Sequence, residues 1–369
     1  METETPFSEL PEALVEEMLN KSDELGRDLS NTFKDINDKK SEVRKKLYEL
    51  EYLKKDSDII TTPSYPTTCG VDGSYGGENL LSTDITAMAS VAVEGLIPPK
   101  EVKYWENPHY ICKILTLQHS DATSLVARAI MMTMELELAT KSPHDVVFMD
   151  GSLTTPFIYF NQALSRIKDV SPELSSYFIE RLGLTLDSYI EVLAAVRSDK
   201  IYSSIPKYTS RKEIAKLVGL NNYEDRGLLS FILEPSEFVG PMPLEQPNQE
   251  WHINNPLQFS ILFDKIISSL KEIYVIYYRP FSHIPALRIE MSKNIALNNN
   301  RLSILLESVK LQCVGGGIME PYPLYLADRM VKHLGTAIPA IRKTMTQEMA
   351  GEWGDDVTSL YLAMHGYRT

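Results

Sequence analysis

The triplet Asp-Gly-Ser occurs twice in the chain, at Asp72-Gly73-Ser74 and at Asp150-Gly151-Ser152, each time after residues typical of a β-strand. Glycine adopts backbone angles that other residues avoid, so each triplet predicts a sharp turn directly after a carboxylate. Two carboxylates at strand ends can face one cleft and hold a metal ion. Each triplet alone also fits an ordinary strand exit, because Asp-Gly is a common turn pair. The aspartates carry the metal prediction, and the serines have no predicted role.

A glutamate on a predicted helix between the two triplets is the next candidate ligand. Residues 120–140 contain no glycine or proline and place apolar side chains on one helical face. This helix carries Glu135 and Glu137, which point to different sides because they are two positions apart. Only one of them should therefore reach the aspartates. Glu135 is the preferred ligand and Glu137 is the alternative.

A late segment supplies a further carboxylate. A run of three glycines at 315–317 is followed by prolines and an apolar helical start, which places Asp328 in the first turns of a helix. The helix dipole favours a carboxylate there, so a purely structural role also fits Asp328. Glu320, in the same segment, is an alternative site residue.

Two basic residues are candidate contacts to a substrate phosphate. Lys207 follows a predicted strand at 201–205, and Arg279 follows another at 274–278. A lysine beside an acidic cluster can hold a scissile phosphate, although solvated lysines are far commoner. Arg279 has low specificity as a phosphate contact.

The predicted elements around these residues have a definite order. Strands are expected at 69–75, 85–93 and 110–117, then the helix at 120–140, then a strand at 145–150. This order resembles the ribonuclease H-like fold of many nucleases, with acidic residues on its first strand, first helix and fourth strand. The predicted fold class is therefore α/β, with a ribonuclease H-like mixed sheet flanked by helices and a long N-terminal helix.

The chain divides into three predicted parts. Residues 1–65 form a helical arm and linker, whose apolar residues recur at helical steps and suit packing on the body or on a second subunit. Residues 66–340 form the main domain, in which 234–258 is expected to be an exposed insertion because proline, asparagine and glutamate are frequent. Residues 341–369 form a C-terminal extension.

Composition limits the class of protein. The 369 residues are 43% hydrophobic and contain no apolar run near the ~20 residues that span a bilayer, so no membrane association and a cytoplasmic location are expected. Three dispersed cysteines argue against a disulfide framework or a cysteine zinc site. A net charge of -13 argues against coating nucleic acid by overall charge, but not against a local basic groove or bridging metal ions.

Taken together, the motifs resemble the NurA nuclease family over residues 66–340. That family has an early Asp-Gly-Ser strand, a helix glutamate, a second strand ending in Asp-Gly-Ser, and a late Tyr-Pro-x-Pro-Leu-x-x-Ala followed by aspartate or histidine. The resemblance makes Asp72, Glu135, Asp150 and Asp328 the catalytic, metal-binding carboxylates. One position departs from the pattern, because Glu320 stands where the family usually has the opening tyrosine. Glu320 then either adds charge to the site or is simply exposed.

The resemblance also implies an activity and partners. It implies 5'-to-3' exonuclease and single-strand endonuclease activity on DNA, a homodimer, and work with a hexameric HerA-type ATPase in end resection during DNA repair or in antiviral defence against phage. Two Mn2+ or Mg2+ ions are expected, because hard ions prefer carboxylate oxygens and two ions can support phosphodiester hydrolysis. The chain has no GxxxxGK[ST] loop, which argues against its own ATP hydrolysis.

Two other functions stay open at this stage. One is a weakly active or inactive dimeric adaptor that caps the translocase, which the Glu320 departure and the acidic charge allow. The other is a metal-dependent hydrolase of a small phosphate ester. Cleavage of DNA compared with a small chromogenic ester, with and without the ATPase, separates these functions.

Overall fold

A nine-stranded mixed sheet forms the centre of the molecule. The computed structural model describes residues 10–60, 65–80, 83–96, 104–313 and 315–353. The strand order is β1-β7-β8-β9-β6-β5-β2-β3-β4, in which β2, β5 and β6 are parallel and the other pairs are antiparallel. The strands are β1 (Leu53–Lys55), β2 (Thr68–Asn79), β3 (Thr83–Glu94), β4 (His109–Gln118), β5 (Val146–Asp150), β6 (Ile201–Ile205), β7 (Glu237–Pro243), β8 (Ile273–Arg279) and β9 (Leu287–Ser292).

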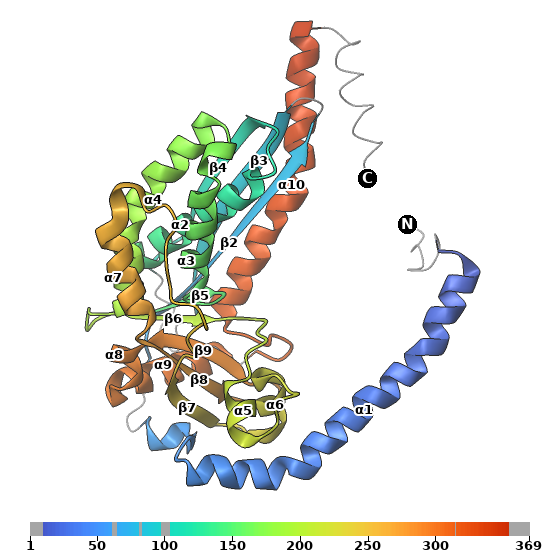
Figure 1. Ribbon diagram of the computed structural model, residues 1–369, viewed down its shortest axis with the longest axis vertical. Helices are drawn as coiled ribbons and strands as arrows, with labels where there is room; N and C mark the ends of the chain where they lie inside the picture. Colours follow the sequence, from blue (N-terminus) through green and yellow to red (C-terminus); the bar gives the residue numbers. More distant parts are fainter. Residues whose placement is uncertain (1–9, 61–64, 81–82, 97–103, 314, 354–369) are drawn as a thin grey trace.

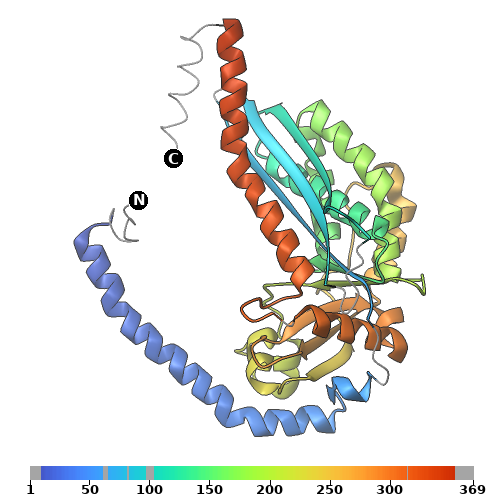
Figure 2. The same ribbon diagram turned by 180° about the vertical axis from the view of Figure 1, so that it is seen from behind.

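Helices cover both faces of the half of the sheet that contains β2, β3 and β4. Helices α2 (Thr123–Lys141), α3 (Thr155–Ser165) and α4 (Pro172–Ala194) lie on one side, and α10 (Tyr322–Trp353) lies across β2 and β3 on the other (Figures 1 and 2). Helix α2 is apolar nearly all round because it lies between the sheet and the outer helices α3 and α4. The predicted order of three strands, a helix and a strand is confirmed, as is the mixed α/β class.

Five further helices complete the described part of the fold. They are α5 (Glu213–Val218), α6 (Asp225–Ile232), α7 (Ser260–Leu270), α8 (Lys293–Ala296) and α9 (Asn299–Gln312). One of them, α7, packs on α4. The α5–α6 pair packs with β7 and β8 around a second hydrophobic cluster, separate from the large core that α2 and α4 share. The large core extends across β5, β6 and β9 to β8, α7 and α9, and the second cluster lies between α1, α5, α6, β7 and β8.

The predicted exposed insertion at 234–258 is wrong over part of its length. Strand β7 lies inside the sheet between β1 and β8, and Phe238 and Val239 are fully buried. The register shifts between Val239 and Met242, and this bulge includes Pro241. A bulge tolerates a proline that cannot donate to the ladder, so the proline content that suggested a loop is compatible with a strand. Only the following residues, 245–250, are consistently exposed.

Two of the predicted boundaries do not coincide with structural breaks. The segment 1–65 contains β1, which pairs with β7 and so belongs to the sheet. The boundary at 340–341 lies inside α10, which is continuous from Tyr322 to Trp353. The rest of the predicted extension, 354–369, and the first residues of the arm, 1–9, lie outside the described residues.

The long N-terminal helix is confirmed as α1 (Glu12–Glu49). Its C-terminal half packs on the α5–α6 pair through the buried side chains of Ile36, Val43 and Leu47. Its N-terminal half extends away from the body as an arm (Figures 1 and 2), and there Leu14 and Met18 are exposed. Packing against the body of the protein therefore uses about half of the apolar residues that recur at helical steps in this segment.

Candidate metal centre

Three of the predicted carboxylates converge at one point. Asp72 lies on β2, Asp150 ends β5 and Asp328 lies in the second turn of α10, and one oxygen of each lies within 4.8 Å of the others. The parallel register of β2 and β5 pairs Val71 with Met149, so the two aspartates that follow are neighbours. Helix α10 approaches β2 closely enough that a Cβ on Gly70 would lie 2.4 Å from the backbone of Leu324. This close approach brings Asp328 to the strands.

The two Asp-Gly-Ser triplets have different structures. Gly151 has a φ of +76° and turns the chain out of β5, as the sequence predicts. Gly73 does not turn the chain, because β2 continues to Asn79. A Cβ at Gly73 would lie 2.5 Å from Oε1 of Glu135 and 2.7 Å from Cγ of Met131. Gly73 is therefore needed to let the Glu135 carboxylate approach β2 from α2, and the predicted turn there is wrong.

The structure brings Glu135 to the aspartates and leaves Glu137 aside. Glu135 is buried beside Gly73, within electrostatic range of Asp72 and Asp150. Glu137 forms ion pairs with Lys141 and Arg181 on the far side of α2. This difference follows from the two-residue spacing along the helix.

Lys207 lies among the carboxylates. Its Nζ atom is 2.8 Å from Asp328, 3.4 Å from Asp150 and 3.5 Å from Glu320, so Glu320 also belongs to this group. We call Asp72, Glu135, Asp150, Glu320 and Asp328 the acidic cluster. Arg279 is not in contact with it, because its guanidinium donates to the backbone carbonyls of Leu233, Ser282 and Ile284 at the end of β8.

The protonation of the acidic cluster reflects burial first and crowded negative charge second. Burial, and then the Asp150 carboxylate, raise the pKa of Asp72 to about 8. Burial and the carboxylates of Asp72 and Asp150 raise the pKa of Glu135 well above its usual value. Burial would also raise the pKa of Asp328, but hydrogen bonds from Lys207 and Lys332 lower it.

The single positive charge of Lys207 does not balance the negative charge of the acidic cluster. Burial by itself would lower the pKa of Lys207, yet Asp150, Asp328 and Glu320 raise it. The remaining negative charge and the oxygen-only donor set fit a hard divalent cation, which would relieve the repulsion among the carboxylates. The described residues thus fit a site for Mn2+ or Mg2+.

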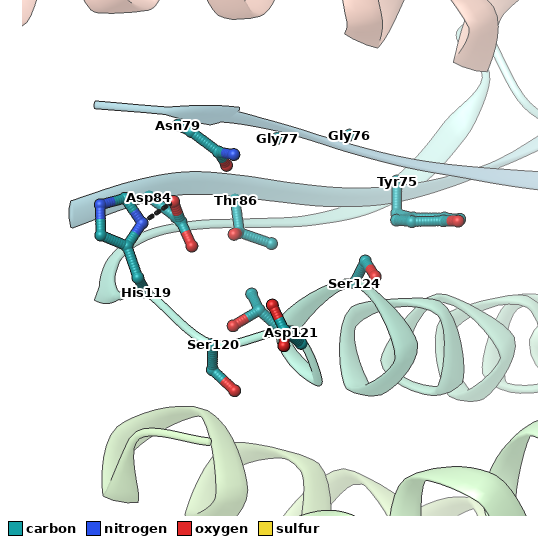
Figure 3. A pocket seen from close by; sticks show the side chains of 11 residues that line it. Tyr75, Gly76, Gly77, Asn79, Asp84, Thr86, His119, Ser120, Asp121 and Ser124 are labelled. Carbon is teal, nitrogen blue, oxygen red and sulfur yellow. Dashed lines mark hydrogen bonds and ion pairs between the residues drawn. The ribbon is translucent and has the colours of Figure 1, made fainter. Parts of the chain in front are cut away.

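A separate cavity of about 370 Å³ lies farther along β2. It is lined by Tyr75 and the following glycines, by Asp84 and Thr86 of β3, and by the start of α2 (Figure 3). His119 contacts Asp84 there through Nδ1 at 2.6 Å. No residue of the acidic cluster lines this cavity.

A contact behind the site is not among the sequence-based predictions. The Ser152 hydroxyl donates to Oε2 of Glu290 at 2.7 Å, and the Leu153 amide donates to the same oxygen at 3.0 Å. Glu290 is buried on β9, 138 residues away from Ser152. One signal was available: Arg288 and Glu290 place opposite charges two apart in an otherwise apolar strand, which predicts a buried pair on one face.

The sheet order and the acidic cluster define a ribonuclease H-like protein with a carboxylate site suited to divalent cations. Within this class, the NurA domain model matches residues 66–333, most of the chain. The chain therefore belongs to the NurA domain family. The resemblance seen in the sequence motifs is confirmed.

Solved structures of NurA proteins share the fold. The NurA nuclease from Sulfolobus solfataricus is 15% identical, and the match covers 93% of this chain and 99% of that one with a TM-score of 0.62. A NurA bound to dAMP and manganese is 14% identical, with 84% and 92% covered and a TM-score of 0.52. A NurA with manganese is 13% identical, with 84% and 96% covered and a TM-score of 0.51.

No protein among the curated sequences matches the chain. Among the described helices, none is both long and apolar enough to cross a membrane.

Proposed function

We propose that the protein is a metal-dependent deoxyribonuclease that hydrolyses phosphodiester bonds with two divalent ions, Mn2+ or Mg2+. The observation that carries the proposal is the convergence of Asp72, Asp150 and Asp328, within 4.8 Å of one another, beside the buried Glu135. Membership of the NurA family supports a nuclease, and two of the similar NurA structures contain manganese, one of them together with dAMP.

The chain's own residues take separate roles in this proposal. Bound ions would activate water and neutralise charge on the phosphoryl and leaving oxygens. Asp72 and Asp150 hold the ions most directly, because they are adjacent on β2 and β5. Glu135 and Asp328 complete the coordination or orient the attacking water. Lys207 points its ammonium between Asp150 and Asp328 and is placed to contact a scissile phosphate.

Glu320 contributes negative charge to the site in place of the family's tyrosine. It lies 3.5 Å from Lys207, and burial raises its pKa. A carboxylate there shares Lys207 with Asp328. We therefore propose that Glu320 restrains Lys207 until a substrate phosphate competes for it.

The finer activities rest on family membership. We propose 5'-to-3' exonuclease and single-strand endonuclease activity, and a homodimer that works with a HerA-type hexameric ATPase in end resection or antiviral defence. The exposed half of α1 offers apolar side chains such as Leu14 and Met18 to a second subunit. We also retain residues 66–340 as the nuclease part of the chain.

The test is degradation of single- and double-stranded DNA with Mn2+, alone and with the ATPase. Asp150→Ala and Glu135→Ala should each reduce cleavage by about 100-fold or more, since partners outside the metal's own ligands already account for 10–100-fold. Glu137→Ala is the matched control on the same helix and should keep wild-type cleavage.

The outcomes separate the candidate functions. Equal cleavage by wild type and Asp150→Ala would refute the catalytic assignment and favour the adaptor. A preference for a small chromogenic phosphate ester over DNA would favour a hydrolase of small esters. If Glu137→Ala loses Mn2+-dependent cleavage and Glu135→Ala keeps it, the site is reassigned.

A further inference from the structure

The two Asp-Gly-Ser triplets hold their aspartates in the same way. The Gly73 amide donates to Oδ1 of Asp72 at 2.8 Å, and the Gly151 amide donates to Oδ1 of Asp150 at 2.8 Å. The direction of each carboxylate therefore depends on the orientation of the peptide that follows it. Any contact that fixes this peptide also fixes the carboxylate.

The two peptides differ in what fixes them. Residues 72–74 continue in β2, where Gly73 pairs with Ser90 of β3, so the sheet holds this peptide. Gly151 has left the sheet at a positive φ, and the β5 ladder ends at Asp150. The second triplet therefore needs another support.

Glu290 supplies that support. Its Oε2 atom accepts hydrogen bonds from the Ser152 hydroxyl at 2.7 Å and from the Leu153 amide at 3.0 Å. Its Oε1 atom accepts from Nε of Arg288 at 2.9 Å, and Arg288 also donates to Glu213 at 2.7 Å. Arg288 and Glu290 are both buried, so charge-assisted hydrogen bonds in a nearly dry setting fix the Glu290 carboxylate.

The other serine has no such partner. The Ser74 hydroxyl makes no hydrogen bond with any residue in the described part of the chain, and its side chain is only partly buried. Identical triplets thus have serines with different surroundings. The serine with a buried partner is Ser152, in the triplet that has left the sheet, and the serine without one is Ser74, in the triplet that the sheet holds.

We propose that Glu290 is a positioning residue for the metal site: through Ser152 and Leu153 it holds the turn after Asp150, and so aims the Asp150 carboxylate. This inference rests on the proposed function, because it assigns the ligand role to Asp150. In this proposal Glu290 is neither a ligand of the ion nor a contact of the substrate. It acts on Asp150 through the Gly151 peptide.

The experiment compares the two serines. The dissociation constant for Mn2+ is measured from free Mn2+ by electron paramagnetic resonance, without DNA, for wild type, Ser152→Ala, Ser74→Ala and Ser152→Thr. Ser152→Ala should weaken Mn2+ binding by about 10-fold, the lower end of the range for partners of metal ligands. Ser74→Ala should stay within about twofold of wild type. Ser152→Thr retains the hydroxyl and should restore most of the affinity.

A second measurement tests whether the Ser152 hydroxyl holds the turn after Asp150, independently of the proposed function. Hydrogen exchange of the Leu153 amide should be faster in Ser152→Ala than in wild type, because loss of the hydroxyl loosens the turn. If wild type binds no Mn2+, the proposed function fails, and the exchange rates alone decide whether Ser152 holds the turn. Unchanged Mn2+ affinity in Ser152→Ala, or equal weakening by Ser74→Ala, would overturn the positioning role. An unchanged exchange rate of the Leu153 amide would show that the Ser152 hydroxyl does not hold this turn.

Discussion

Gly73 allows a helix carboxylate to reach the sheet. The space that a side chain would fill is occupied by Oε1 of Glu135, 2.5 Å from the position of a Cβ. The family motif can be described by its aspartates, yet the glycine between aspartate and serine is a spatial requirement at residue 73. The position of Gly73 on β2 beside Glu135 therefore matters more than its capacity to turn the chain.

Gly73→Ala should therefore displace Glu135 and Met131. We expect a loss of stability of about 1–3 kcal/mol from overpacking and a marked loss of Mn2+-dependent cleavage. The measurements are urea unfolding and DNA degradation. The control is Gly227→Ala in α6, where nothing lies within 4 Å of the added Cβ. If Gly73→Ala cleaves DNA like wild type, Glu135 does not need its observed position.

Asp72 should make the metal-free protein less stable as the pH rises. Its pKa in the folded chain is about 8, above the value of about 4 in an unfolded chain, so folding favours the protonated form. The stability from this group is complete below about pH 4 and is lost as the pH rises to about 8.

Asp72→Asn tests this pH dependence. In the presence of a chelator, the variant should melt at a higher temperature than wild type at pH 8.5, and the difference should shrink at pH 5. A difference that is the same at both pH values would contradict the raised pKa of Asp72.

At the residue scale, the sequence predicts the acidic cluster better than its supports. The convergence of Asp72, Asp150 and Asp328 beside Glu135 could be predicted because each lies at a recognisable place on a strand or helix. The partner of Ser152 could not, because Glu290 is 138 residues away and the contact depends on how β9 pairs with β6. Arg279, a charged residue at a strand end, donates to the backbone carbonyls of Leu233, Ser282 and Ile284.

At the scale of elements, the polar contacts that attach α1 to the body include a bidentate ion pair. Arg44 donates to both carboxylate oxygens of Glu237 at 2.6 and 2.9 Å, and Glu237 lies on the buried strand β7. The bidentate pair joins the helix to a strand whose composition predicts an exposed loop. Local composition indicated a loop there, but pairing with β1 and β8 decided the structure.

Arg44→Ala should lower the free energy of unfolding by about 1–3 kcal/mol, because it leaves a buried carboxylate without its charged partner. Lys40→Ala is the matched control, since Lys40 pairs with the half-exposed Glu234. That loss should be below about 1 kcal/mol. Both are measured by urea unfolding, and equal effects would contradict the structural role of the Arg44–Glu237 pair.

At the scale of the whole molecule, the arm and the body are separable. The residues of α1 that are buried against the body begin at Ile36, while Leu14, Met18 and Leu25 are exposed. The free part of the arm is consistent with a role between subunits.

Removal of residues 1–30 should therefore leave a folded body with a melting temperature close to that of the full chain. If the arm joins two subunits, the shortened protein should become monomeric. Sedimentation equilibrium of both proteins provides the measurement. A dimer that persists without the arm would place the contact elsewhere.

The two halves of the sheet meet at a short seam. Strands β6 and β9 share only two residue pairs, Ser203 with Met291 and Ser204 with Glu290. Mechanical load that separates the halves would act first on this seam, and hence on Glu290. Because Glu290 also accepts hydrogen bonds from Ser152 and Leu153, tension applied far from the acidic cluster would reach the turn after Asp150 directly.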